Sequence, residues 1–567
     1  MADGSEAMKP LLIVPMTGIS SRFTAAGYDR PKFMLEVDGQ LIIDHVIDMY
    51  PDWDDVIFIC NGRHLDDSRL DLEAHLLRRR PRAKVVRLDA PQKGPGDAVL
   101  KVRGLIDRAR AVVVNYCDFT VYWDSDILSE RLCSGEVDGI IPCYTGFHPH
   151  RAFSTFYAYV KMEHGRVTDI QEKQPWSDNP AEEFASSGTY AFATGAILLD
   201  ALDEQVEKKY LLKGEYYLSL TFKPILERGG RVEVLDIEHF MQWGTPQDLE
   251  EYKDTSAALA SWNRPRVVDD CGNGADQIPT ARVILASGAG SRFAQAGYSV
   301  PKPLLPLAGI TVLEHALSAL PGTETMFVTR ADLPGNDAVE ALALASGASI
   351  ARLGGLSEGQ ASSALAGLRM LTMNGPVTVG ACDALPTVSL SAFSAAVEAA
   401  GADGIVTWVA PALHAAKRKP DQYGWAAAHG SKIEAVWIKC APAVADAGVM
   451  IGTFTFPSVT SAIRQIEALI GDGERVNGEY YLDSLVRRAL TTGRPAIALN
   501  VTTFVSVGTP TEYEALRYWQ SCLHKWALHP YSLVSDPLVP TGARARLDAE
   551  FRRHSRSQRH TWGNCES

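Results

Sequence analysis

Short hydrophobic runs alternate with amphipathic stretches through the first half of the chain. The runs are rich in valine, isoleucine and leucine and lie at 11–15, 56–60, 84–88, 111–116 and 139–144. Helix-like amphipathic stretches separate them at 41–50, 67–80 and 96–106. Strands that alternate with helices form a mostly parallel sheet covered on both faces, so the pattern predicts an α/β fold. Ligands of such sheets collect beyond the carboxyl ends of the strands, which here are the loops after Pro15, Leu88 and Tyr116.

The second half of the chain repeats the landmarks of the first half in the same order. LLIVPMTGISSRFTAAGYDRPKFMLEVDG near the start matches RVILASGAGSRFAQAGYSVPKPLLPLAG much later. The paired landmarks include Arg22 and Arg292, Lys32 and Lys302, Asp118 and Asp383, and Gly-Glu-Tyr-Tyr-Leu at 214–218 and 478–482. The first two pairs are each 270 positions apart. This regular spacing predicts two homologous domains.

The repeat sets the expected domain boundaries. We expect domain 1 at 8–253, a linker at 254–280, domain 2 at 281–520 and a C-terminal extension at 521–567. The tail from 543 onwards contains arginines at 544, 546, 552, 553, 556 and 559. A mobile, solvated tail is the favoured interpretation, and contact with an acidic partner or a membrane surface is the alternative.

Composition excludes several classes of protein. Apolar residues make up 46% and charged residues 22% of the 567 residues, as in a globular protein. The net charge of −13 disfavours a nucleic-acid partner. No apolar run approaches the length of a membrane span, and the N-terminus lacks the layout of a secretory signal. Nine scattered cysteines without a CxxC pair indicate reduced thiols and a cytoplasmic protein.

The loop after the first hydrophobic run is the first candidate for chemistry. Its small residues, Thr17, Gly18, Ser20 and Ser21, follow Met16 and let backbone N–H groups approach phosphate oxygens. Arg22 adds a forked donor suited to phosphate, and Lys32 adds a point charge. A simple strand-to-helix turn is the structural alternative, but the same spacing in both repeats favours a phosphate site.

Asp118 and Asp383 each end a hydrophobic run. A carboxylate beside a phosphate loop suits Mg²⁺, which binds one or two carboxylates together with substrate phosphates and waters.

The segment Gln92–Val99 contains Gly94 and Gly96, whose small size would let a flat base lie against the backbone. A plain turn is the alternative for that segment.

Three further groups of residues have competing interpretations. Glu172 and Lys173 follow an apolar run and would suit the hydroxyls and phosphate of a second substrate, although an isolated pair is more often surface charge. His148 and His150 lack a Cys/His partner at ligand spacing, which disfavours zinc. Trp123, Trp176 and Trp243 suit pocket lining and core packing equally. No nucleophile elbow, Walker A motif or kinase catalytic loop is present.

Several of these motifs occur together. They are G-x-S-S-R-F…P-K, the strand-end Asp, Glu-Lys-x-Pro, Ser-Gly-Thr-Tyr-x-Phe at 187–192, Gly-Glu-Tyr-Tyr and W-G-T-P-x-D-L. The set resembles nucleotidyltransferases of the sugar-1-phosphate type over nearly all of domain 1 and at the same landmarks of domain 2. Asn-Tyr-Cys-Asp-Phe with Gln-Trp-Gly-Thr-Pro-Gln-Asp-Leu is similar to proteins associated with bacterial capsule or surface-polysaccharide synthesis.

The resemblance implies two tandem Rossmann-like domains of the GT-A-like type. It also implies transfer of a nucleotidyl group from an NTP to a phosphorylated acceptor, with release of pyrophosphate and with Mg²⁺ as cofactor. Arg22 would bind the leaving pyrophosphate, Lys32 would neutralise the reacting phosphates, and Asp118 would hold Mg²⁺. The nucleotide would contact Met16, Thr17, Gly18, Ser20, Ser21, Gln92, Gly94 and Gly96. The acceptor would contact Glu172, Lys173, Gly188 and Glu215.

Domain 2 has counterparts for many of these residues. They are Gly288, Gly290, Ser291, Arg292, Lys302, Asp383 and Lys439. Ile438 stands where domain 1 has Glu172, and GQASSA replaces GPGDAV. Domain 2 therefore either uses another acceptor or binds nucleotide without turnover.

The metal-binding pattern also departs from the family. Many relatives have an Asp two residues before the Gly of the late Gly-Thr-Pro, where this chain has Gln242 and Ser506. Glu215 and Glu238 are then the candidates for a second ligand. No motif separates CTP from UTP, GTP, ATP or dTTP, and a sugar-1-phosphate is the acceptor that the resemblance implies.

Two other functions compete with a nucleotidyltransferase. A GT-A glycosyltransferase would normally show Asp-x-Asp after the strand, which Cys117-Asp118-Phe119 does not supply. A nucleotide-binding regulatory or scaffold protein, with one or both domains inactive, would bind nucleotide without releasing pyrophosphate. The two fused domains leave the oligomeric state open.

Overall fold

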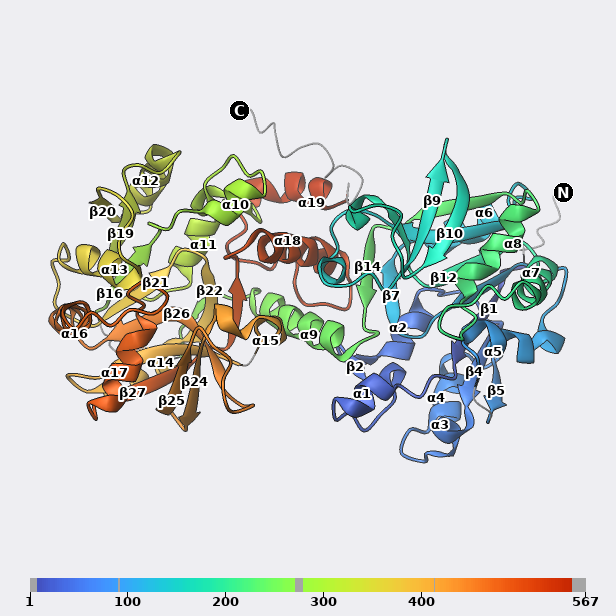
Figure 1. Cartoon of the computed structure of the whole chain (residues 1–567), viewed down its shortest axis with the longest axis horizontal. Coiled ribbons are helices and arrows are strands. Elements are labelled where there is room, and N and C mark those ends of the chain that lie inside the picture. Colours follow the sequence, from blue (N-terminus) through green and yellow to red (C-terminus); the bar gives the residue numbers. More distant parts are fainter. Residues whose placement is uncertain (1–7, 90–91, 271–278, 412, 553–567) are drawn as a thin grey trace. The chain divides into compact units, whose positions relative to one another are not determined.

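The chain folds into two units, each built around its own sheet (Figure 1). The first unit extends to Leu249 and the second runs from Glu250 to Arg552. The computed structural model describes residues 8–89, 92–270, 279–411 and 413–552. Each unit is considered by itself below.

A mixed sheet forms the centre of the first unit. Its strand order is β10-β9-β11-β8-β12-β6-β1-β4-β5, with β13 beside β8. The pairs β1–β4, β1–β6, β4–β5 and β13–β8 are parallel. The strands are β1 (Leu11–Met16), β4 (Val56–Asn61), β5 (Lys84–Leu88), β6 (Val112–Asn115), β8 (Gly139–Tyr144), β9 (Ala158–Glu163), β10 (Arg166–Glu172), β11 (Phe184–Ser186), β12 (Thr189–Phe192) and β13 (Val232–Asp236).

Helices cover both faces of this sheet (Figure 1). Along β1, Leu12 and Val14 belong to one buried cluster, whereas Leu11 and Ile13 belong to another. This alternation is expected of a strand whose two faces are both buried, and it confirms the predicted α/β fold. The helices are α1 (Ser21–Ala25), α2 (Ile42–Asp48), α3 (Gly62–Asp66), α4 (Leu72–Arg79), α5 (Pro95–Lys101), α6 (Ser125–Cys133), α7 (Gly195–Glu207) and α8 (Phe222–Glu227).

The second unit repeats this architecture. Its sheet has the order β20-β19-β16-β21-β26-β23-β27-β25-β24, so its first four strands correspond to β5-β4-β1-β6. The strands are β16 (Ala281–Leu285), β19 (Glu324–Arg330), β20 (Ser349–Leu353), β21 (Val377–Ala381), β23 (Ile405–Ala410), β24 (Gly424–His429), β25 (Lys432–Ile438), β26 (Gly448–Phe456) and β27 (Ala496–Asn500). The helices are α10 (Ser291–Gln295), α11 (Val312–Ser318), α12 (Asn336–Ala345), α13 (Gln360–Leu368), α14 (Leu390–Ala400), α15 (His414–Arg418), α16 (Val459–Gly471) and α17 (Asp483–Thr491).

Short antiparallel pairs and turns complete each unit. In the first unit β2 (Glu36–Val37) pairs with β3 (Gln40–Leu41), and β7 (Phe119–Tyr122) pairs with β14 (His239–Gln242). In the second unit β17 (Pro306–Leu307) pairs with β18 (Ile310–Thr311), and β22 (Ala384–Ser389) pairs with β28 (Thr503–Ser506). Among the residues that the structure describes, no helix is both long and apolar enough to cross a membrane.

The segment expected as a linker at 254–280 contains regular structure. Helix α9 (Pro246–Ser261) covers its start, and β15 (Val267–Val268) pairs in parallel with β22. Residues 271–278 lie outside the described residues. The part that is described belongs to the second unit.

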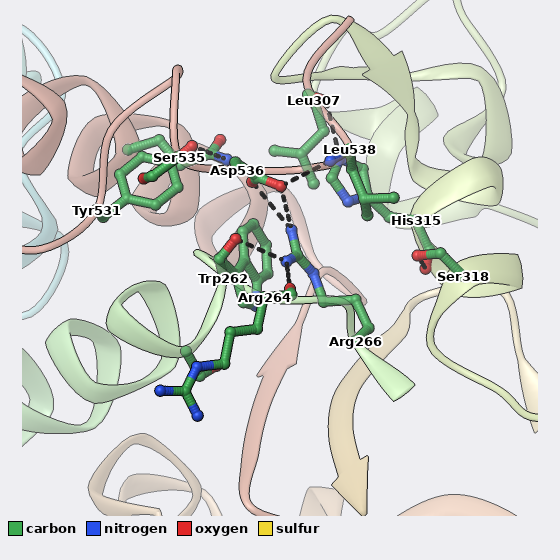
Figure 2. Close-up of polar contacts among 12 residues, drawn as sticks. Trp262, Arg264, Arg266, Leu307, His315, Ser318, Tyr531, Ser535, Asp536 and Leu538 are labelled. Atoms are coloured by element: carbon green, nitrogen blue, oxygen red, sulfur yellow. Dashed lines mark hydrogen bonds and ion pairs between the residues drawn. The ribbon is translucent and has the colours of Figure 1, made fainter. Parts of the chain in front are cut away.

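The C-terminal extension packs on the second unit through a buried ion pair (Figure 2). The extension expected at 521–567 begins within α18 (Pro510–Lys525). Residues of the tail expected to be mobile from 543 onwards form helix α19 (Arg544–Arg552), whose Leu547 and Phe551 are buried. The Arg266 Nη2 lies 3.0 and 3.2 Å from the two carboxylate oxygens of Asp536, and both side chains are at most 1% exposed. The guanidinium also lies over the Trp262 ring, 4.1 Å from its centroid. The basic tail at 553–567 lies outside the described residues.

We expect Asp536→Asn to destabilise the second unit by about 3–5 kcal/mol, because Arg266 would remain as a buried, uncompensated charge. Asp403→Asn is the matched control, since Asp403 pairs with Arg464 at the surface and such pairs contribute about 1 kcal/mol at most. Urea denaturation followed by tryptophan fluorescence measures both. Equal decreases in the free energy of unfolding of the two variants would contradict a stabilising role for the buried pair.

His315 makes the second unit sensitive to acid. Burial and the nearby Arg266 lower the pKa of His315 to about 3, and its Nε2 lies 2.9 Å from the Leu307 carbonyl oxygen. The unfolded chain therefore binds a proton below about pH 6.5 that the folded chain does not, so stability falls as the pH falls. When the pH falls from 6.0 to 5.0, we expect the free energy of unfolding of the wild-type protein to decrease by about 1 kcal/mol more than that of His315→Gln. Urea denaturation at both pH values tests this, and parallel losses would contradict it.

Candidate active site

The residue before the first short helix is left-handed in both units. Ser20 and Gly290, which precede α1 and α10, are both left-handed, with φ of 55° and 63°. A left-handed backbone is cheap for glycine but strained for serine. The Ser20 Oγ accepts a hydrogen bond from the Lys32 N–H at 3.1 Å. Ser20, which stands where the second repeat has Gly290, therefore connects the loop to the Pro-Lys turn by a hydrogen bond.

An ion pair joins that turn to the end of a strand. The Lys32 Nζ lies 2.5 Å from the Asp118 Oδ2, with the two side chains 22% and 21% exposed. Burial lowers the pKa of Lys32, but the Asp118 carboxylate outweighs it, so the pKa is raised. The Lys302 Nζ lies 2.5 Å from the Asp383 Oδ2 in the second unit. Both sites thus bring together the lysine and the aspartate that the sequence placed at separate landmarks.

The late Gly-Thr-Pro loop packs directly against Asp118. The Trp243 N–H donates to the Asp118 carbonyl oxygen at 2.9 Å. A Cβ added to Gly244 would lie 2.8 Å from the Asp118 Oδ2, so only glycine leaves that oxygen room. Gln242 donates from Nε2 to the Asp248 Oδ2 at 2.9 Å. Gln242, at the position expected for a second metal ligand, therefore binds a carboxylate in the first turn of helix α9.

The Gln92–Gly96 loop is fixed by the Gly-Glu-Tyr-Tyr segment. The Tyr216 N–H donates to the Lys93 carbonyl at 2.8 Å, and the Gly96 N–H donates to the Tyr216 carbonyl at 2.9 Å. Gly94 has φ of +89°, and a Cβ there would lie 2.9 Å from the Tyr216 nitrogen. Glycine at 94 thus allows the close packing of two backbone segments. The second unit keeps the same pair of bonds between Tyr480 and 358–361.

These elements surround a cavity of about 660 Å³ in the first unit. The expected site residues that line it are Thr17, Gly18, Ser20, Ser21, Arg22, Lys32, Gln92, Gly94, Asp118 and Glu215. Met16 and Gly96 are buried beside it, whereas Glu172, Lys173, Gly188 and Glu238 are absent from its lining.

A chain of polar contacts connects the cavity to the predicted acceptor pair. The Lys173 Nζ donates to the Tyr217 hydroxyl, which donates to the Glu215 Oε2, both at 2.6 Å. The Ser219 Oγ donates to the Glu172 Oε2 at 2.6 Å. Burial raises the pKa of Glu172 and lowers the pKa of Lys173. The half-buried pair is therefore connected to the cavity by hydrogen bonds and differs from ordinary surface charge.

Gly188 lies on the other side of Asp118. Its carbonyl accepts the Tyr116 N–H at 3.1 Å, and a Cβ there would lie 3.0 Å from the Phe119 ring. With φ of +98°, this position strongly favours glycine. Gly188 therefore permits the strand-end segment that holds Asp118 to approach β12.

The second unit has a cavity of about 460 Å³ at the equivalent place. The expected residues that line it are Gly288, Gly290, Lys302 and Asp383, together with Glu479. Ser291, Arg292 and Lys439 are absent from its lining. The Lys439 Nζ donates to the Gln422 carbonyl at 2.6 Å instead.

Other residues singled out by the sequence have structural partners. His150 is buried, which holds its pKa well below the usual range, and its Nε2 lies 3.1 Å from the Tyr144 hydroxyl. The His148 ring lies 4.4 Å from that of Tyr144. Trp123 and Trp176 donate from their indole nitrogens to backbone carbonyls, and Trp243 is fully buried.

Sequence reasoning missed several lining residues of the first cavity. They are Asn61, Arg63, Asp89, Tyr116 and Tyr217. The Asn61 Nδ2 donates to the Thr17 carbonyl at 3.0 Å and so supports the phosphate loop. Asn61 ends β4, so the strand-end rule that selected Asp118 would also have selected it.

Solved structures include similar folds at low identity. The nucleoside-diphosphate-sugar pyrophosphorylase from Vibrio cholerae RC9 is 22% identical, over 43% of this chain and 99% of that one, with a TM-score of 0.35. A putative glucose-1-phosphate thymidylyltransferase from Bacillus anthracis is 16% identical, over 43% and 93%, with a TM-score of 0.35. The inositol-1-phosphate CTP transferase from T. maritima is 14% identical, over 44% and 95%, with a TM-score of 0.34. No curated protein matches the chain.

A family model resolves the question of class. The MobA-like NTP transferase domain matches residues 12–161 and 282–475, one region in each unit. This confirms the predicted nucleotidyltransferase resemblance and its tandem arrangement. Because the match covers more than half of the sequence, the chain belongs to the family of proteins with a MobA-like NTP transferase domain.

Proposed function

We propose that the first unit transfers a nucleoside monophosphate from an NTP to a phosphorylated acceptor and releases pyrophosphate. The central supporting observation is the Lys32–Asp118 ion pair, which lies in the same cavity as the Gly18–Arg22 loop. This reaction agrees with membership of an NTP transferase family. It also agrees with a site that contains a carboxylate and hydrogen-bond donors able to bind phosphate.

The proposed chemistry needs positioning more than proton transfer. An oxygen of the acceptor phosphate attacks the α-phosphorus, the bond to the bridging oxygen breaks, and pyrophosphate leaves with the electron pair. The nucleophile is already anionic, so a general base is unnecessary. Lys32 would neutralise the α-phosphate, and the exposed Arg22 would bind the leaving pyrophosphate. Backbone N–H groups of the loop would hold the remaining phosphate oxygens.

The residues around Asp118 fit a magnesium ion. Among the described residues there is no group of three or more His, Cys, Asp or Glu side chains that could hold a metal. Mg²⁺, however, needs only one or two carboxylates when phosphates and waters complete its shell. Asp118 lies in the cavity with Glu215, and its Oδ2, which pairs with the Lys32 Nζ, has room on the side of Gly244. When bound by Asp118, Mg²⁺ would supply charge neutralisation at the phosphates.

For the acceptor, we propose a phosphorylated sugar or another small phosphorylated metabolite with hydroxyl groups. Glu172 would accept hydrogen bonds from hydroxyls, and Lys173 would bind the phosphate. The product would be an NDP-linked precursor, made in the cytoplasm where NTPs are available, for a surface polysaccharide. The motifs around Asp118 and Gly244 are the features that favour this destination.

The Asp118→Asn variant tests the proposed reaction. With Mg²⁺, five NTPs and a panel of sugar-1-phosphates and other phosphorylated metabolites, we expect pyrophosphate release with at least one acceptor of the wild-type protein to fall about 100-fold or more in this variant. Asp126→Asn, which alters an exposed carboxylate paired with Lys9, should retain activity with that acceptor. Full activity in Asp118→Asn with every acceptor that the wild-type protein uses would refute the role of Asp118. Nucleotide binding without pyrophosphate release from any pair would favour a regulatory or scaffold protein.

Gly94→Ala tests the packing of the nucleotide loop. The added Cβ would clash with the Tyr216 backbone at a left-handed position, so we expect NTP affinity to fall about tenfold. Gly104→Ala is the matched control, because a Cβ there meets nothing within 4 Å. Calorimetric titration with NTP measures both. Equal affinities in the two variants would show that the geometry at Gly94 is unimportant for binding.

A further inference from the structure

The predicted acceptor lysines occupy the same position in the two units. The Lys173 N–H donates to the Tyr157 carbonyl at 2.8 Å, and the Lys439 N–H donates to the Tyr423 carbonyl at 3.0 Å. Both lysines are left-handed, with φ of 61° and 55°. The register of β9 with β10 therefore matches that of β24 with β25, and their residues can be compared one by one.

Within this shared register, the carboxylate near the lysine comes from a different position in each unit. Glu172 faces Ala158 across its strand pair, whereas Ile438 faces Gly424. Ser219, which donates to Glu172 in the first unit, corresponds to Asp483 in the repeat. The carboxylate has thus moved from the strand to the start of α17.

A third difference between the units, Gly424 in place of Ala158, makes room for the Asp483 carboxylate. A Cβ added to Gly424 would overlap the Asp483 Oδ1 and lie 3.3 Å from its Cγ. Asp483 is only 6% exposed, so its carboxylate lies buried against β24. The first unit has Ala158 at this strand position and needs no such space. Glycine at 424 and aspartate at 483 are therefore coupled substitutions.

The electrostatic surroundings of the two carboxylates are alike. Burial raises the pKa of Asp483, and Lys439 opposes the shift. Burial likewise raises the pKa of Glu172, with Ser219 and Lys173 opposing it. A buried carboxylate is costly, and a position with only a structural role would accept the serine of the first unit. The second unit instead has a carboxylate at this position, and the charge of Lys439 favours its ionised form.

The nucleotide half of the second site is also present. Lys302 and Asp383 form the same ion pair as in the first unit and line a cavity with Gly288 and Gly290. Glu479, four residues before Asp483, lines that cavity as well.

We propose that Asp483, together with Lys439, forms the acceptor subsite of a second, working nucleotidyltransferase site. This inference rests on the reaction proposed for the first unit. Asp483 would accept a hydrogen bond from a hydroxyl of the acceptor, and Lys439 would bind its phosphate. Because the carboxylate comes from α17 and an apolar Ile438 replaces Glu172, the second site takes a different hydroxyl-bearing phosphorylated metabolite. Asp483 is therefore the specificity-determining residue of the second unit.

Steady-state kinetics of the full chain with Asp118→Asn test the proposal, because this substitution silences the first site. With the same panel, we expect residual pyrophosphate release with at least one acceptor, lost when Asp383→Asn is added. Adding Asp483→Asn, which keeps the size of the side chain, should raise the KM for that acceptor at least tenfold. The KM for NTP should stay within twofold, and Asp472→Asn, at an exposed surface pair, should change neither.

Three results would overturn the proposal. They are the absence of Asp383-dependent release with every acceptor, an unchanged acceptor KM in Asp483→Asn, and an equal rise of both KM values. If wild-type release is lost completely in Asp118→Asn, the function proposed for the first unit stands while this inference fails.

A second variant distinguishes a change of acceptor preference from a folding defect, because a misfolded chain could not gain a new preference. Gly424→Ala, Ile438→Glu and Asp483→Ser together rebuild the arrangement of the first unit. In the Asp118→Asn chain we expect this triple variant to turn over the acceptor that the first site prefers. A preference unchanged from the parent chain would also contradict the assignment.

Discussion

The lysine–aspartate ion pair at the end of a central strand is the contact on which the site depends. Lys32 lies just after the phosphate loop and Asp118 lies 86 residues further on, yet they meet at 2.5 Å. Around this pair, Ser20 fastens the loop and Gly244 brings the late loop against the carboxylate. Breaking a largely buried pair leaves an uncompensated charge, so its partners are held in a fixed place before any substrate arrives. Its exact repetition by Lys302 and Asp383 shows that both units keep this arrangement.

The two units differ where the acceptor would bind. Both keep a left-handed lysine at one strand end, but the neighbouring carboxylate comes from β10 in one unit and from α17 in the other. Asp483 needs the space that Gly424 leaves, and the first unit has Ala158 at this strand position. Divergence on the acceptor side, with conservation of the nucleotide side between the repeats, is the arrangement expected if one chain activates two different metabolites with the same chemistry.

Much of this could be predicted from the sequence because the repeat supplied two examples of each landmark. The hydrophobic runs at 56–60 and 139–144 form β4 and β8, and the family and fold were both predicted. The helix expected at 67–80 is shorter, α4 (Leu72–Arg79), because Asp71 before it is left-handed with φ of 44°. The exchange between Glu172 and Asp483 was invisible, since it depends on strand register and on the space beside Gly424. Sequence pattern fixes periodicity, but it does not show which side chains from distant segments touch.

The most direct test of the account follows the α-phosphorus itself. An NTP labelled at the α-phosphate is incubated with the chain, Mg²⁺ and the acceptor panel, and the products are separated. The account predicts that the label moves into an NDP-linked acceptor while unlabelled pyrophosphate is released in equal amount. Label that remains in the NTP, or that appears only as free NMP or NDP, would contradict nucleotidyl transfer as the function of this site.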